Sequence, residues 1–367
     1  MASSGDSSAT RGGPGAVSAV VVYYQGERHL PACLDALLAQ DAPLDEVLVV
    51  DNGSTDASLG LLAERYPSVR VVELGENAGP ARARNVGMRE ARNRWVLAVD
   101  NDAVLAPDVL SRLLAAAALH PEAAILQPRS VFDHEPGRVH YDGGAPHFAG
   151  LIRLRNFYVP IERAEGQGVV PVDVAVSVCL LVDSLALLDL GGYDPSFFIL
   201  FEDLDLSYRL RLAGWSILSV EDAIVRHRAG TPGVSFREGR HYPARRVYYH
   251  ARNRWLFLLK CLRWRTLLVS SPALLLYEAA GFAFALRHGA LLAWASGKLA
   301  VLRGAAALAE RRAAVQSTRV LADRELLVGG PLTLTPDVAK SARAARLGGL
   351  LDAALCRWWS WVSRHAG

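Results

Sequence analysis

Several hallmarks of other protein classes are missing from this sequence of 367 residues, and each absence excludes something. The four cysteines are far apart and form no CxxC pair, which argues for a reducing compartment and against a disulfide or zinc framework. Residues 1–15 hold no apolar run, so we expect a disordered tail over 1–16 and no signal peptide. Neither GxxxxGK[ST] nor GxGxxG occurs, which excludes a P-loop and a dinucleotide fingerprint.

Charge is distributed unevenly along the chain. Residues 237–319 contain 15 Lys and Arg but 3 Asp and Glu, an excess of 12 positive charges in a chain whose net charge is +3. Long aliphatic runs interrupt these charges, so the segment is expected to contact a membrane surface and no nucleic acid. Within it, residues 266–286 are apolar except for a few positions such as Pro272 and Glu278. A carboxylate near mid-span is unfavourable in a bilayer, which favours interfacial helices over a transmembrane span. A helical cap packed on the rest of the chain is the alternative.

Strand-like and helix-like stretches alternate in the first hundred residues. We predict strands over 17–23, 46–50, 69–73 and 95–100, with helices over 30–40, 56–66 and 81–91. This alternation predicts a mostly parallel, doubly wound α/β sheet. A helix is expected over 107–119, a long loop region over 130–168, and one strand over 172–182.

Residues 201–214 allow two interpretations. Apolar residues alternate from Leu204 to Leu212, which by period alone indicates a strand. However, acidic residues crowd the start, arginines lie near the end, and Gly214 stands at the position of a helix C-cap. We therefore predict a helix.

Polar residues follow two of the predicted strands at their carboxyl ends, where open α/β sheets bind ligands. Asp100 and Asp102 are two residues apart, so an extended backbone directs both carboxylates the same way. Such carboxylates repel each other unless a cation lies between them, and oxygen ligands suit Mg²⁺ or Mn²⁺. Asp51 ends the second strand and would contact a ribose or base edge. For Asp100 and Asp102 the alternative is a strand that ends in an Asx turn, and for Asp51 it is a plain strand-to-helix turn with Asp56 as N-cap.

Two further candidates lie elsewhere in the chain. Residues 77–87 combine a turn with the start of a helix. Arg82 and Arg84 would neutralise a diphosphate there, and the Asn85 amide would bind a carbonyl. Solvated arginines on a surface helix are the alternative. His227 follows a strand-like run, and a lone histidine is usually structural, but a metal held by nearby carboxylates would make it a ligand.

Together these segments resemble the family 2 glycosyltransferases, particularly their bacterial rhamnosyltransferase-like branch. The matching segments occur in the family's order and are 20–27, 49–56, 77–87, 99–102, 191–194, 201–206 and His227. The resemblance implies a GT-A fold, a nucleotide-diphosphate sugar donor, a divalent metal and inversion at the anomeric carbon.

The resemblance also implies roles on the donor side of the site. Asp51 would read the nucleotide base, and Asp100 would contact the ribose or uridine. Tyr24, Arg84 and Asn85 are expected to complete the nucleotide site.

Metal binding and catalysis are implied for four other residues. Asp102 and His227 would hold Mg²⁺ or Mn²⁺, which neutralises charge on the departing nucleoside diphosphate. Asp203 would be the general base for the acceptor hydroxyl, with Glu202 as the less favoured candidate.

Three departures from the family pattern affect this interpretation. Gln25 stands where the family usually has Asn, at the first-strand contact to the nucleotide. Ser177-Val178 replaces a small Gly-Ala pair near the acceptor. Ala251 occupies the Gln position of the Q-x-x-R-W motif of processive members, which favours addition of one or a few sugars over polymer synthesis.

The sequence thus predicts a GT-A catalytic domain over 17–235 and a basic, apolar helical region over 236–367. We expect transfer from dTDP-rhamnose or a UDP-sugar to a saccharide or polyprenyl-linked saccharide, for cell-wall or surface polysaccharide. The enzyme would be cytoplasmic and peripheral on the inner face of the cell membrane. A sugar-nucleotide pyrophosphorylase is one alternative, although its Gly-rich loop after the first strand is missing. A non-catalytic membrane scaffold is another, against which Asp102, Asp203 and His227 argue.

Overall fold

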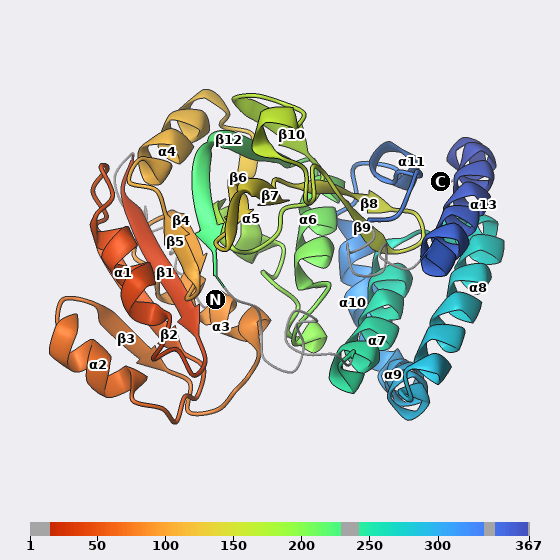
Figure 1. Cartoon of the computed structure of the whole chain (residues 1–367), viewed down its shortest axis with the longest axis horizontal. Helices are drawn as coiled ribbons and strands as arrows, with labels where there is room; N and C mark the ends of the chain where they lie inside the picture. Colours follow the sequence, from red (N-terminus) through yellow and green to blue (C-terminus); the bar gives the residue numbers. More distant parts are fainter. Residues whose placement is uncertain (1–14, 229–241, 334–341, 366–367) are drawn as a thin grey trace, which may run out of the picture.

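The computed structural model describes residues 15–228, 242–333 and 342–365 (Figure 1). Its first half alternates strands and helices as predicted, with ends that agree within two residues. These elements are β1 (Val17–Tyr23), α1 (Leu30–Leu38), β2 (Glu46–Asp51), α2 (Ser58–Arg65), β3 (Arg70–Glu73), α3 (Pro80–Glu90) and β4 (Trp95–Asp100). β1 pairs in parallel with β2 on one side and β4 on the other.

The sheet continues beyond β4 in the order β10-β12-β6-β11-β4-β1-β2-β3, with β5 paired to β12 and β7 to β6. Its remaining elements, together with the small β8-β9 sheet, are β5 (Ala103–Leu105), α4 (Val109–Leu119), β6 (Ala123–Phe132), β7 (Glu135–Tyr141), β8 (Gly144–His147), β9 (Leu151–Leu154), η1 (Ile161–Arg163), β10 (Val169–Val172), β11 (Cys179–Asp183), α5 (Ser184–Asp189), η2 (Pro195–Phe197), α6 (Glu202–Leu212) and β12 (Ser216–His227). The helix predicted over 201–214 is confirmed as α6.

Two predictions of secondary structure are wrong. The expected loop region 130–168 contains β7, β8, β9 and η1, because these strands are short and Gly and Pro obscure their alternation. The single strand expected over 172–182 is two strands. Its apolar run changes partner part-way, since Val172 pairs with β12 whereas Cys179 pairs with β4.

Helices cover both faces of the sheet. Along β1, Ala19 and Val21 pack in one buried cluster with residues of α1 and α4, whereas Val20 and Val22 pack in another with residues of α3 and α5. All seven residues of β1 are buried. This burial on two faces is typical of a parallel sheet in a doubly wound fold, which confirms the predicted class.

A helical region follows and lies to one side of the sheet (Figure 1). It consists of α7 (Ala244–Cys261), α8 (Trp264–Arg287), α9 (Leu291–Arg303), α10 (Ala305–Ser317), α11 (Asp323–Leu326) and α13 (Ala342–His365). Its core is continuous with the part of the chain that forms the sheet, because Tyr208 of α6 meets Phe257 of α7 edge-to-face at 5.3 Å. The predicted tail, apart from its last two positions, and the predicted boundary at 235/236 lie outside the described residues.

One helix in the described part of the chain, α8, is long and apolar enough to cross a membrane, and 22% of its most apolar stretch is buried. The adjoining helices α9 and α10 would qualify only as one broken span, because they are bent by 68°.

Candidate functional site

The carboxyl ends of β4 and β12 meet at one edge of the sheet. β5 follows directly after Asp102 and pairs with β12 so that Ala103 lies opposite His227. This register brings Nε2 of His227 to 3.1 Å from Oδ2 of Asp102. Burial alone would raise the pKa of Asp102, but the hydrogen bond and charge of His227 lower it below its ordinary value. Asp102 is therefore ionised at neutral pH and able to bind a cation.

The Asp102–His227 pair fits a divalent ion as part of a shared ligand set. Two neighbouring ligands of an octahedral ion with bonds of about 2.1 Å are about 3 Å apart, close to the 3.1 Å between these atoms. Across the described chain, no cluster of three or more His, Cys, Asp and Glu side chains is able to hold a metal. The remaining ligands would thus have to come from substrate oxygens and water, as is usual for Mg²⁺ beside phosphates.

His140 contacts His227 and orients its ring. Nothing in the sequence indicated this role for His140. Nδ1 of buried His140 lies 3.0 Å from Nδ1 of His227, and the rings stack at 4.9 Å. If Nε2 of His227 binds a metal, its Nδ1 carries the hydrogen and donates a hydrogen bond to Nδ1 of His140. Such contacts fix the tautomer and ring orientation of a ligating histidine.

Arg84 connects the strand-end carboxylates to α6. From α3, its Nη2 donates to Oδ1 of Asp100 at 2.7 Å, and its Nη1 lies 3.7 Å from Oε1 of Glu202. Arg84 and Glu202 are each 6% exposed. Burial raises the pKa of Asp100 to about 6 despite the opposing effect of Arg84. Burial, reinforced by the charge of Asp203, also raises the pKa of Glu202 well above its ordinary range.

Asp203 is held at the first turn of α6 by Ser177. The Ser177 hydroxyl donates to Oδ1 of Asp203, and the Ser177 N–H donates to Oδ2 at 3.0 Å. The Tyr193 hydroxyl lies 2.8 Å from the same serine oxygen. The backbone N–H groups at the start of α6 favour negative charge at this end of the helix. Asp203 is half-buried, so its carboxylate is fixed yet accessible.

A second polar cluster lies at the end of β2. Asp51 is 2% exposed and accepts a hydrogen bond from the Ser54 N–H at 3.0 Å. Gln25, the departure noted above, donates to Oγ1 of Thr55 and accepts from the N–H groups of Thr55 and Asp56. Gln25 thereby holds the turn that follows Asp51. Tyr24, beside it, is 47% exposed.

The Asn85 side chain forms two hydrogen bonds with the backbone of Tyr193. Its amide donates to the Tyr193 carbonyl at 2.7 Å, and its oxygen accepts from the Tyr193 N–H at 2.8 Å. Gly192 makes this close approach possible, because a Cβ there would lie 2.4 Å from Oδ1 of Asn85. Both polar groups of Asn85 thus bind the segment before α6, and its expected contact with the nucleotide stays a prediction.

Known proteins resemble this chain in sequence over much of its length. Residues 18–175 match the family model described as Glycosyl transferase family 2. The N-acetylglucosaminyl-diphospho-decaprenol L-rhamnosyltransferase of Mycobacterium tuberculosis is 30% identical over 263 residues, which cover 65% of this chain and 82% of the relative. The chain belongs to glycosyltransferase family 2. This family 2 glycosyltransferase is also 23% identical over 230 residues to the amylovoran biosynthesis glycosyltransferase AmsE of Erwinia amylovora, covering 61% of this chain and 80% of AmsE.

Solved structures agree with the GT-A fold. GalNAc-T7 with UDP, GalNAc and Mn²⁺ matches with a TM-score of 0.54 and 16% identity, over 70% of this chain and half of GalNAc-T7. Residues 1–349 of S. aureus TarS with UDP-GlcNAc match with a TM-score of 0.51 and 18% identity, over 77% of this chain and 79% of that one. At these identities the likeness concerns the fold alone.

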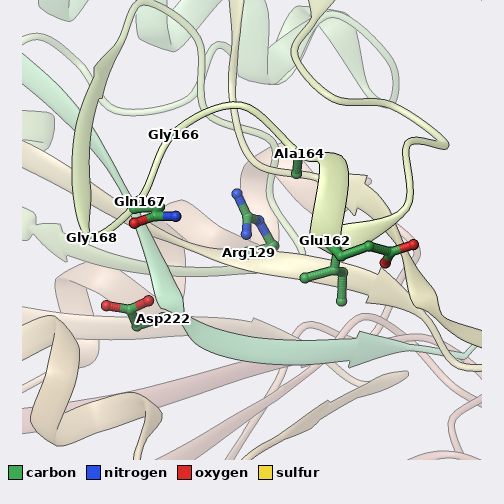
Figure 2. Close-up of a pocket in the computed structure, with 8 residues that line it drawn as sticks. Arg129, Glu162, Ala164, Gly166, Gln167, Gly168 and Asp222 are labelled. Carbon is green, nitrogen blue, oxygen red and sulfur yellow. The ribbon is translucent and has the colours of Figure 1, made fainter.

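An open cavity of about 580 Å³ lies apart from the residues predicted for the site. It is bounded by the segment around η1, by β6 and by β12 (Figure 2), and its lining residues are Arg129, Ile161, Glu162, Ala164, Gly166, Gln167, Gly168 and Asp222. Arg129 there pairs with buried Asp142 and Glu221, and Arg155 pairs with the same two acids. These two arginines and two acids balance in charge, so the cavity offers no uncompensated cation to an anionic substrate.

Proposed function

We propose that this family 2 glycosyltransferase is inverting and metal-dependent. It transfers a sugar from a nucleoside diphosphate-sugar, dTDP-rhamnose or a UDP-sugar, to a hydroxyl of a polyprenyl-linked saccharide. The similarity to the mycobacterial rhamnosyltransferase, whose name specifies a diphospho-decaprenol acceptor and an L-rhamnosyl group, supports this choice of substrates. The product would enter cell-wall or surface polysaccharide.

The observation that carries the proposal is the bridge made by Arg84. It bonds to Asp100, two residues before Asp102, and lies beside Glu202, the residue before Asp203. Arg84 therefore connects the donor end of the site to the acidic residues at the start of α6, although about a hundred residues separate them in sequence. An acceptor hydroxyl near Asp203 would face the donor held at Asp51, Asp100 and Arg84.

The chemistry follows from these positions. Asp203 accepts the proton of the acceptor hydroxyl while that oxygen forms a bond to the anomeric carbon. The bond from that carbon to the diphosphate breaks, and the nucleoside diphosphate leaves with the electron pair. Asp102 and His227 would hold Mg²⁺ or Mn²⁺, which supplies charge neutralisation on the leaving diphosphate. Attack from the side opposite the leaving group inverts the anomeric configuration.

The outer surface of the helical region favours a position on the inner face of the cell membrane. Large apolar side chains of α8 and α9 are 59% to 87% exposed: Leu268, Leu275, Leu286, Leu292 and Leu302. Arg263, Arg265 and Arg287 flank α8 or lie at its ends. Exposed leucines flanked by arginines are typical of helices that lie in the interface of an anionic membrane.

A donor screen tests the proposal. Purified full-length protein would be supplied with UDP-, dTDP- and GDP-sugars, a polyprenyl-diphosphate saccharide and Mg²⁺ or Mn²⁺, and nucleoside diphosphate release would be measured. We expect release with one donor class, complete loss in EDTA, and a product of inverted anomeric configuration by NMR. Absence of release with every donor would contradict the proposal.

A further inference from the structure

The segment that leads into the α6 carboxylates has an unusual backbone. Phe198, Leu200 and Phe201 have φ values of 61°, 69° and 73°, and none of them is glycine. A non-glycine residue with such a φ is strained, so surrounding contacts must hold the segment in place. Glu202 and Asp203 follow at once, and their direction therefore depends on this segment.

Asn253 of α7 supplies those contacts. Its buried side-chain amide donates to the carbonyls of Phe197, Ile199 and Leu200 at 2.9, 2.9 and 2.7 Å, with one of its two N–H groups shared between two carbonyls. Arg252 donates to the Asn253 oxygen at 2.8 Å, which fixes the orientation of the amide so that its N–H groups face the segment. One side chain thus binds three carbonyls within four residues.

Arg252 and Gly79 support the same segment from other directions. Nη2 of Arg252 donates to the carbonyls of Ser196 and Phe197 at 2.7 and 2.9 Å. On the other side, Gly79 at the start of α3 lies so close that a Cβ would be 2.9 Å from the Phe198 oxygen. The segment is thus held between α7 and the helix that carries Arg84.

We propose that Asn253 is a positioning residue for sugar transfer. It holds residues 197–201, of which Phe198, Leu200 and Phe201 have positive φ, in the conformation that directs Asp203 toward the acceptor. This rests on the proposed function, because it takes Asp203 as the base. It also gives the helical region a part in the reaction, since Asn253 belongs to α7 and its neighbour Trp255 donates to Glu278 of α8 at 2.7 Å.

The test compares Asn253 with a matched side chain. Gln316 of α10 also donates its amide to two carbonyls, those of Lys260 and Cys261, and also accepts from an arginine, Arg319. It therefore resembles Asn253 in its bonding but caps the far end of α7. For Asn253→Ala we expect kcat to fall about 10²-fold, the size expected for a displacement of about 1 Å at a reacting group. For Gln316→Ala we expect kcat within about threefold of the wild type.

Binding measurements distinguish positioning from general damage. Asn253→Ala should leave donor KM, and the affinity for nucleoside diphosphate by calorimetry, within about threefold of the wild type. If Asn253→Ala does not fold, Asn253→Ser is used, because its shorter side chain keeps one hydroxyl in the buried site while removing the amide that binds the three carbonyls. Wild-type kcat in a folded variant, or a parallel loss of kcat and nucleotide affinity, would overturn the proposal.

A third variant separates this proposal from the proposed function. If Asp203→Asn is inactive while the Asn253 variant keeps its wild-type kcat, only the positioning role is refuted. If Asp203→Asn remains active, the assignment of the base is refuted, whatever the Asn253 variant does.

Discussion

Replacing Glu278 by leucine is expected to destabilise the protein, although α8 is apolar. Oε1 of Glu278 accepts hydrogen bonds from Arg254 at 2.5 Å and Trp255 at 2.7 Å, and Oε2 lies 2.7 Å from Nζ of Lys298. The Arg254 side chain is 1% exposed. Glu278→Leu would leave this guanidinium buried without its carboxylate, while the leucine would add an apolar group.

The magnitude follows from burial. Removing one partner of a buried ion pair costs about 3–5 kcal/mol, and we take the lower end because the Glu278 side chain is 18% exposed. At about 2 °C per kcal/mol, the melting temperature should fall by roughly 6 °C. Glu278→Gln keeps an acceptor for Trp255, so its melting temperature should lie between those of the wild type and Glu278→Leu.

Thermal unfolding and liposome flotation together provide the assay. Glu310→Leu on α10 is the control, because Glu310 is exposed and its loss should change the melting temperature little. If α8 instead crossed the bilayer with its carboxylate in lipid, Glu278→Leu would favour insertion, since a charge at mid-bilayer costs about 2.5–3.5 kcal/mol. A higher melting temperature with stronger membrane association would refute the inward ion pair.

Three further predictions concern the site and its surroundings. Glu202→Gln should keep kcat at pH 7 within about threefold of the wild type, measured by nucleoside diphosphate release. The raised pKa of Glu202 means that its carboxyl group is already protonated, and an amide has the same shape; a loss of kcat as large as that of Asp203→Asn would contradict this. His140→Phe should weaken Mn²⁺ binding by calorimetry about 10-fold through loss of the contact with His227, whereas His134→Phe, the control, should not; equal affinities in all three proteins would contradict it. Burial lowers the pKa of His147 from its ordinary 6.5 to about 4, so the free energy of unfolding decreases as the pH falls from 6.5 toward 4. Chemical denaturation should show that His147 makes the protein about 2 kcal/mol less stable at pH 5 than at pH 7.5, and His147→Asn should remove this pH-dependent difference.

Much of the fold could be predicted from the sequence because its signals are local. The strands β1 to β4 are apolar runs bounded by turn residues, and the helices between them have apolar residues at helical spacing. α6 was the harder case, and the charges at its two ends decided it correctly. The strands within 130–168 were missed because they are short, β7 and β8 contain Gly and Pro, and the β6–β7 pairing is irregular. Val131 of β6 pairs with Val139 of β7, for example, in an irregular register.

The candidate site, like the fold, could be predicted from the sequence only in part. Asp102 and His227 were predicted as partners, and the structure brings their side chains together. What the sequence could not provide was the set of contacts that aim these groups. Ser177 holds Asp203, and Asn253 binds carbonyls more than fifty residues away. A serine or an asparagine carries no local pattern that indicates such a role, because the role arises only from packing.

The most direct test of the central claim is single-turnover transfer by Asp203→Asn compared with the wild type. With preloaded donor, acceptor and Mn²⁺, we predict a loss of about 10²-fold or more in the rate of nucleoside diphosphate release, because the acceptor hydroxyl would lose its base. Affinity for the nucleoside diphosphate should be unchanged. Release at the wild-type rate would contradict the account.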